Sequence, residues 1–81
     1  MDLTHAGNTV IPAIKVLRSQ GFSVQLDATK GRCTAERGEN RFTADDPVAV
    51  LGLVTLYQVL GDRWQLPDSE LMDLGREYGL L

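Results

Sequence analysis

The chain has 81 residues, of which 43% are hydrophobic and 23% are charged, and its formal net charge is −3. This length leaves room for a single domain, placed over residues 1–81, and the composition is that of a folded domain and excludes a disordered chain. The charge balance argues against binding to nucleic acid, because proteins that bind it concentrate Lys and Arg on one face.

Cysteine usage and hydropathy bear on the cellular setting. Cys33 is the only cysteine, so no disulfide can form within the chain, and the N-terminus has no secretory segment. No apolar run is long enough to span a bilayer. We therefore expect a small cytoplasmic protein of bacterial origin that does not contact a membrane.

The first helix is predicted over residues 9–20, after a flexible polar lead-in over residues 1–8. Gly21 fits its end, because glycine readily adopts the positive φ that closes many helices. Apolar residues recur along this segment at the spacing of one helical face, namely Val10, Ala13, Ile14 and Leu17.

Three short strands are predicted next, as an antiparallel meander. Pairing Leu26 with Cys33, and Ala35 with Phe42 across a two-residue turn at Gly38-Glu39, separates apolar from polar residues on the two faces. A slip of one residue would mix the two faces. The predicted inward face consists of Phe22, Val24, Leu26, Cys33, Ala35, Phe42 and Ala44.

The second helix is the most informative segment. Asp46 is its predicted N-cap, Pro47 its first residue and Gly61 its C-terminal stop. Between them the helix is apolar around most of its circumference, and such a helix needs cover on several sides, from the rest of the chain, a second copy or a partner.

Within this helix, the expected solvent-facing stripe is limited to three residues, Leu51, Thr55 and Gln58. Leu53 and Leu56 are expected in the core. Gly52 costs about 1 kcal/mol of helix stability relative to alanine, so we expect another group to pack close to the backbone there.

A third helix is predicted to begin at Asp68 as its N-cap, with frayed residues 79–81 behind it. Its expected inward stripe is Leu71, Leu74, Gly75 and Tyr78. The predicted fold class is α+β with two layers, in the order helix, three-stranded meander, helix, helix, and the first two helices are expected to cover the apolar face of the sheet.

The order helix, three strands, helix over residues 9–61 resembles the double-stranded RNA-binding domain. That family has a lysine cluster at the start of its second helix, where this chain has Asp45-Asp46-Pro47. Carboxylates at this point repel a phosphate backbone, so the chain departs from the family where the family grips RNA.

The residues that could carry chemistry all have a structural explanation. His5 is the only histidine and is expected to be solvated, Cys33 is expected to be a small core residue, and Asp45 and Asp46 are expected to cap a helix. We therefore predict no catalytic, cofactor-binding or metal site, and no cofactor.

The candidate interaction residues are Trp64, Arg63, Arg32 and Arg41. Trp64 and Arg63 lie in a connector between helices, and Trp and Arg are the types most enriched at binding hot spots. Two readings of Trp64 stay open, a plug for the end of the core and an anchor for a partner. Arg32 and Arg41 are predicted on the outer face of the sheet.

The sequence favours a non-enzymatic protein-interaction module that associates with itself, as a homodimer, or with another protein. The first alternative is a ligand-binding or enzymatic domain with a cleft between sheet and helices, for which Thr55, Tyr57 and Gln58 are the only polar groups expected inside. The second is nucleic-acid binding, which the net charge disfavours.

Overall fold

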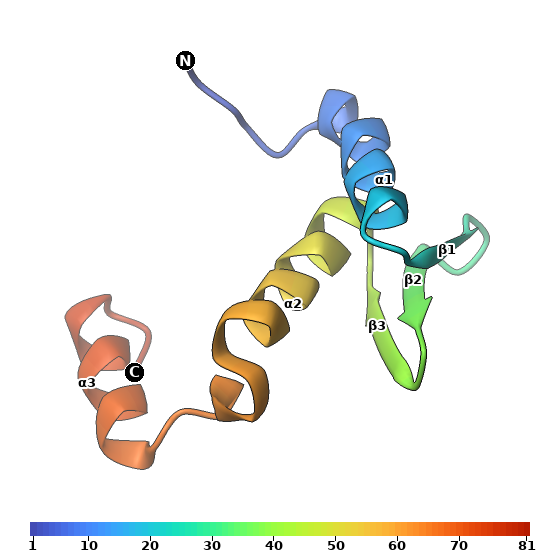
Figure 1. Cartoon of the computed structure of the whole chain (residues 1–81). Coiled ribbons are helices and arrows are strands. Elements are labelled where there is room, and N and C mark those ends of the chain that lie inside the picture. Colours follow the sequence, from blue (N-terminus) through green and yellow to red (C-terminus); the bar gives the residue numbers. More distant parts are fainter.

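The computed structural model describes all 81 residues and has an α+β fold. Figure 1 shows the elements in chain order. They are a 3₁₀ turn η1 (Gly7–Thr9), helix α1 (Val10–Ser19), strands β1 (Ser23–Asp27), β2 (Arg32–Arg37) and β3 (Asn40–Ala44), helix α2 (Pro47–Leu60), a second 3₁₀ turn η2 (Gly61–Trp64) and helix α3 (Asp68–Glu77).

The three strands form one antiparallel sheet in the order β1-β2-β3. The predicted register is confirmed at both strand pairs, with Leu26 opposite Cys33 and Ala35 opposite Phe42. Gly38 in the tight turn has a φ of 61°, which only glycine adopts without strain. The alternation of apolar and polar residues was therefore sufficient to set the pairing.

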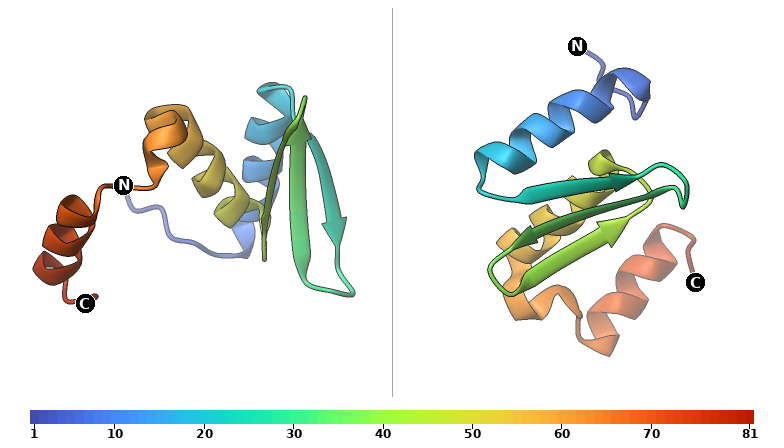
Figure 2. Two further views of the ribbon diagram at one scale, coloured as in Figure 1. Left: turned by 90° about the horizontal axis from the view of Figure 1, so that it is seen from below. Right: turned by 90° about the vertical axis from the view of Figure 1, so that its right-hand side faces the viewer.

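α1 and α2 lie side by side on one face of the sheet, as the first view of Figure 2 shows. The other face carries polar side chains, among them the ion pair of Glu36 with Arg41 and the hydrogen-bonded pair of Thr34 and Thr43. This is the predicted two-layer arrangement. The core between the layers is small, since only nine of the 81 residues are buried. Its central cluster consists of Leu17, Phe22, Cys33, Ala35, Val50 and Val54.

α2 begins and ends as predicted. The Asp46 carboxylate accepts a hydrogen bond from the Ala49 N–H at 2.9 Å, Pro47 is the first helical residue, and Gly61 closes the helix with a φ of 58°. The Asp46 carboxylate thus satisfies one of the backbone N–H groups that lack a partner in the first turn.

The predicted burial of α2 was partly wrong. Val50 and Val54 are buried, but Leu53 and Leu56 are exposed, whereas Leu51, expected in the solvent stripe, packs against the core. Leu26 on β1 is also 57% exposed although it lies on the inward side. The helix is apolar on every side, so its composition did not reveal which side the sheet covers.

α3 stands apart from the rest of the molecule (Figures 1 and 2). Its predicted inward stripe has no cover, because Leu71, Leu74 and Tyr78 are exposed. Asp68 is the first helical residue and not the N-cap, since the extended backbone of Pro67 immediately precedes the helix. The predicted packing of α3 onto the domain was therefore wrong.

The C-terminal end of α3 is tied down by its own chain. Gly79 has a φ of 71°, and the N–H groups of Gly79 and Leu80 donate to the carbonyls of Arg76 and Gly75. This is a Schellman motif. The Leu81 side chain lies over Gly75, so residues 79–81 close the helix where a frayed end was expected.

The stability of the domain should depend on the small central core. Leu17→Ala removes a side chain with no exposed surface, and we expect it to lower the free energy of unfolding by about 2–5 kcal/mol. Ile11→Ala on the same helix is the matched control, because Ile11 is 76% exposed and its loss should change stability by less than about 0.5 kcal/mol. Denaturant unfolding followed by circular dichroism measures both, and equal losses would contradict this core.

Candidate functional site

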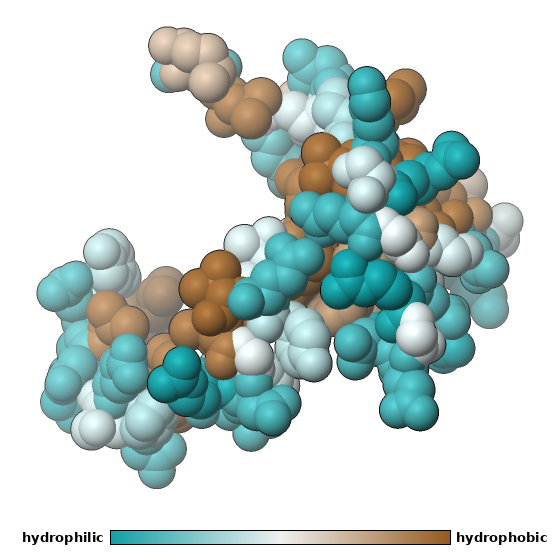
Figure 3. Space-filling view, in the orientation of Figure 1, coloured by the Kyte–Doolittle hydropathy of each residue, from teal (hydrophilic) through white to brown (hydrophobic).

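The side of α2 that points away from the sheet is apolar and uncovered. We call this surface the far face of α2, and it consists of Val48, Gly52, Leu56, Val59 and Leu60. Leu56 is 49% exposed and Val59 is 71% exposed. The far face carries no charged side chain, and Figure 3 shows hydrophobic residues gathered over this part of the molecule and on the neighbouring side of α3.

A groove of about 530 Å³ runs along this side of α2. It is lined by Val48, Leu51, Gly52, Thr55, Leu56, Val59 and Leu60. Thr55 is the one polar side chain among them, and its hydroxyl donates to the Leu51 carbonyl at 2.9 Å. The groove therefore offers apolar surface without free polar groups.

Gly52 lies in the middle of this groove. Apart from its chain neighbours and the backbone of its own helix, no atom comes within 4 Å of the place where a Cβ would sit. Glycine at this position lowers the stability of the helix by about 1 kcal/mol relative to alanine. No side chain of the same chain occupies the space that an alanine methyl group would fill. The structure thus shows no group packed close to the backbone at Gly52, contrary to the expectation from the sequence.

A second, smaller groove of about 280 Å³ lies between β3 and α2, and we call it the Trp64 groove. It is lined by Arg41, Phe42, Thr43, Leu53, Leu56, Tyr57 and Trp64. The Phe42 and Tyr57 ring centroids are 5.8 Å apart. Arg41 forms an ion pair with Glu36 at 3.3 Å on the outer side of the sheet.

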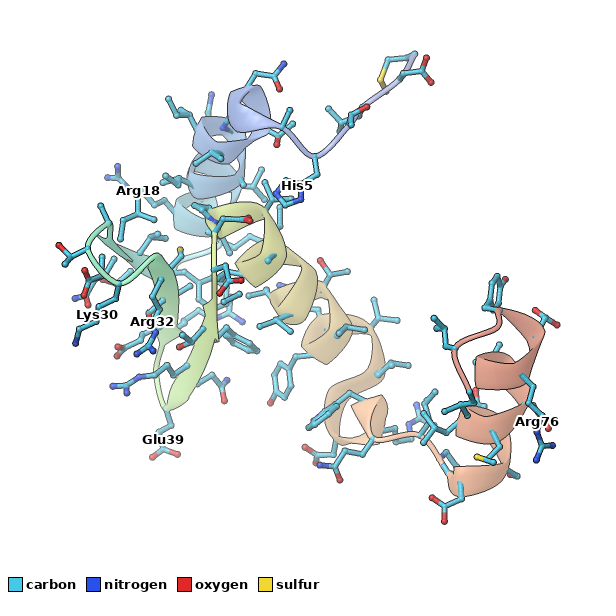
Figure 4. The ribbon with its side chains drawn as sticks, turned by 180° about the vertical axis from the view of Figure 1, so that it is seen from behind. His5, Arg18, Lys30, Arg32, Glu39 and Arg76 are labelled. Atoms are coloured by element: carbon cyan, nitrogen blue, oxygen red, sulfur yellow. The ribbon has the colours of Figure 1, made fainter.

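The structure brings two of the four predicted interaction residues together. Trp64 and Arg41 line the same groove, and Arg63 is exposed beside Trp64 in η2. Arg32 lies elsewhere, near Lys30 at the end of the β1–β2 hairpin (Figure 4). Trp64 is 54% exposed, so the indole packs against the groove without closing the end of the core.

The chain exposes more surface than a compact monomer of its size. Its accessible area is 6450 Å², whereas a folded monomer of 8.9 kDa exposes about 4,800 Å². Its radius of gyration of 14.6 Å likewise exceeds the roughly 12 Å expected for a compact domain of this length. The exposed segments include the lead-in over residues 1–8, α3 and the side of α2 that points away from the sheet.

Charge divides the chain into two parts. Residues 1–67 contain seven basic and seven acidic side chains, whereas residues 68–81 contain one basic and four acidic side chains. The net charge of −3 therefore belongs to α3 and its flanks. Figure 4 shows Arg76, the basic residue of this part, far from the basic residues of the sheet.

His5 has a partner that the sequence did not indicate. Its Nε2 lies 3.1 Å from the Asp46 carboxylate, which places the lead-in segment beside the start of α2 (Figure 4). The hydrogen bond from the Ala49 N–H, with a smaller contribution from His5, lowers the pKa of Asp46. The His5 side chain is 58% exposed, as expected, but its contact with Asp46 was not foreseen, since contacts between distant segments leave no local sequence signal.

Cys33 and the potential metal ligands are the remaining groups that could carry chemistry. Cys33 is fully buried, and burial, followed by the charge of Asp46, raises the pKa of its thiol, so the nucleophilic thiolate is disfavoured. No three His, Cys, Asp or Glu side chains lie close enough together to hold a metal ion. None of the helices combines the length and apolarity that a bilayer-spanning segment needs.

Comparison of the chain with protein-family models, with curated proteins and with solved structures found no match. The two grooves and the far face of α2 are therefore the surfaces from which a function can be inferred.

The half-exposed position of Trp64 predicts an intermediate cost for its removal. We expect Trp64→Ala to lower the free energy of unfolding by about 2 kcal/mol, between the 3–5 kcal/mol typical of a fully buried Trp and the change of at most ~0.5 kcal/mol typical of surface sites. Trp64→Phe should keep most of the stability, because an aromatic ring still covers Tyr57 and Leu53. A loss from Trp64→Ala in the range of about 3–5 kcal/mol, typical of a fully buried Trp, would contradict the exposed placement.

The lowered pKa of Asp46 predicts a specific dependence of stability on pH. Because the pKa of the folded state lies below the ordinary value of about 3.9, the stabilising contribution of Asp46 is complete above that value and is lost as pH falls through the folded pKa. Asp46→Asn keeps a side-chain cap but cannot titrate. The free energy of unfolding of this variant should therefore fall less steeply than that of the parent as the pH is lowered from about 5 to about 2. Identical acid limbs for the variant and the parent in urea unfolding would overturn the assignment.

Proposed function

We propose that the protein is a non-enzymatic interaction module that associates with itself through the far face of α2. The observation that carries this proposal is the exposed, uncharged, apolar far face of α2, where Leu56 is 49% and Val59 is 71% exposed. The whole chain, with α3 and residues 1–8 included, exposes about 1,600 Å² more than a compact monomer, and a standard interface takes roughly 800 Å² from each partner. An interface of that size would remove part of this excess.

The far face is better suited to a protein surface than to a small molecule. A ligand-binding or catalytic cleft holds a few convergent polar groups that orient the ligand, and the one hydroxyl in the larger groove is already bonded to Leu51. Exposed apolar surface of this extent marks interaction sites on soluble proteins. The same features favour an interface over an enzymatic cleft.

Nucleic-acid binding receives no comparable support. The outer face of the sheet carries Arg32 and Arg41, but Asp27 lies opposite Arg32 and Glu36 pairs with Arg41. The net charge is −3, so a phosphate backbone would meet a neutralised surface.

The proposal predicts different effects for two equivalent substitutions. Val59→Lys and Ile11→Lys each place a cation at an apolar helix position that is 71% or 76% exposed, respectively. A buried, unpaired charge costs about 3–5 kcal/mol, so we expect Val59→Lys to weaken self-association at least ~100-fold. Ile11→Lys should leave it unchanged.

Sedimentation velocity at matched concentrations measures these effects. Val59→Lys should fold normally as a monomer, because a cation in the last turn of α2 suits the helix dipole. Circular dichroism serves as the folding control. An unchanged sedimentation coefficient for a folded Val59→Lys variant would show that the far face of α2 is not the interface.

A further inference from the structure

The groove on the far face of α2 has the form of a notch centred on one residue. Gly52 supplies no side chain, and Val48, Leu51, Thr55 and Leu56 form the walls around it. A Cβ at Gly52 would meet nothing within 4 Å, so the notch opens to the outside of the molecule. Another helix laid across it could approach the backbone of α2 more closely than at any position that carries a side chain.

The same helix also carries side chains that could fill such a notch. Leu56 and Val59 lie on the far face one and two turns after Gly52, and both are about half or more exposed. A surface that has both the notch at Gly52 and the protruding side chains of Leu56 and Val59 can be self-complementary, as a two-fold symmetric interface requires. No charged residue lies between Pro47 and Leu60, so two copies of α2 would not bring like charges together at the axis.

We propose that two copies of the chain pair through α2 across a two-fold axis, with the two backbones closest at Gly52. The partner is thus a second copy of this chain, and the inference rests on the proposed function, which it makes specific. The whole chain exposes about 1,600 Å² more than a compact monomer, so a standard interface, which takes roughly 800 Å² from each partner, accounts for part of this excess. The glycine is placed where the partner's helix needs the space, which explains why the chain tolerates it in mid-helix.

Gly52→Ala distinguishes a solvent-facing glycine from one at a close helix crossing, because the two cases predict different dissociation constants for the dimer. At a solvent-facing position, alanine raises helix stability and leaves self-association unchanged. At a close crossing, the added methyl group pushes the two helices apart, so we expect the dimer dissociation constant to rise at least ~tenfold, while the dilute monomer melts at a higher temperature. Gly7→Ala is the matched control, since a Cβ at Gly7 also meets nothing within 4 Å.

Cross-linking tests the same geometry without relying on an affinity. A disulfide forms only when two Cα atoms approach within about 7 Å, so Gly52→Cys should form a covalent dimer in full-length protein under mild oxidation. Gly7→Cys should remain a monomer on a non-reducing gel. The native Cys33 is fully buried and should not compete.

The outcomes distinguish the inference from the proposed function. If Val59→Lys dissociates the protein but Gly52→Ala does not weaken it and Gly52→Cys does not cross-link, self-association stands and the crossing at Gly52 is wrong. A parent chain that is monomeric at every concentration contradicts both. Weakened association of Gly52→Ala together with cross-linking of Gly52→Cys supports both.

Discussion

The arrangement of the molecule follows from the mismatch between α2 and what covers it. α2 is apolar on all sides, and the sheet and α1 cover one of them, where Val50 and Val54 enter the core. The opposite side has Leu56 and Val59 exposed. Since removing apolar surface from water is the main driving force for both folding and association, this uncovered side is the feature of the chain that most favours a partner.

The other helices of the chain do not provide that cover. α1 lies over the sheet beside α2 and completes the core through Leu17. The extended backbone of Pro67 directs the chain away from α2 before α3 begins. Four acidic side chains in residues 68–81 favour contact of this part with water. α3 nevertheless presents Leu71, Leu74 and Tyr78 to solvent, so it offers exposed apolar surface of its own in addition to the far face of α2. The neutral body and the acidic C-terminal part are thus two surfaces of different character on one short chain.

Local patterns made much of the fold predictable. Strict alternation fixed the strand register, and the sequence Asp46-Pro47 together with Gly61 marked both ends of α2. Burial within α2 was not predictable to the same degree, since a helix that is apolar on every side carries no information on which side faces the core. Leu53 and Leu56 were therefore placed in the core although they lie outside it.

The sequence predicted the residues of the candidate site but not their arrangement in space. The apolar helix, the unexplained Gly52 and the exposed pair Trp64 and Arg63 are all visible in the sequence. Their relative positions in space are not visible in the sequence. These positions depend on how far the sheet extends under α2 and on the direction of the chain after Pro67. The contact between His5 and Asp46 is of the same kind.

Self-association through α2 is measured most simply as the mass of the full chain in solution. Size-exclusion chromatography with light scattering, run from micromolar to millimolar protein, should give a particle of twice the 8.9 kDa chain mass over most of that range, with dissociation only on dilution. A constant mass of one chain up to the highest concentration would mean that the far face of α2 remains in water, and it would contradict the account.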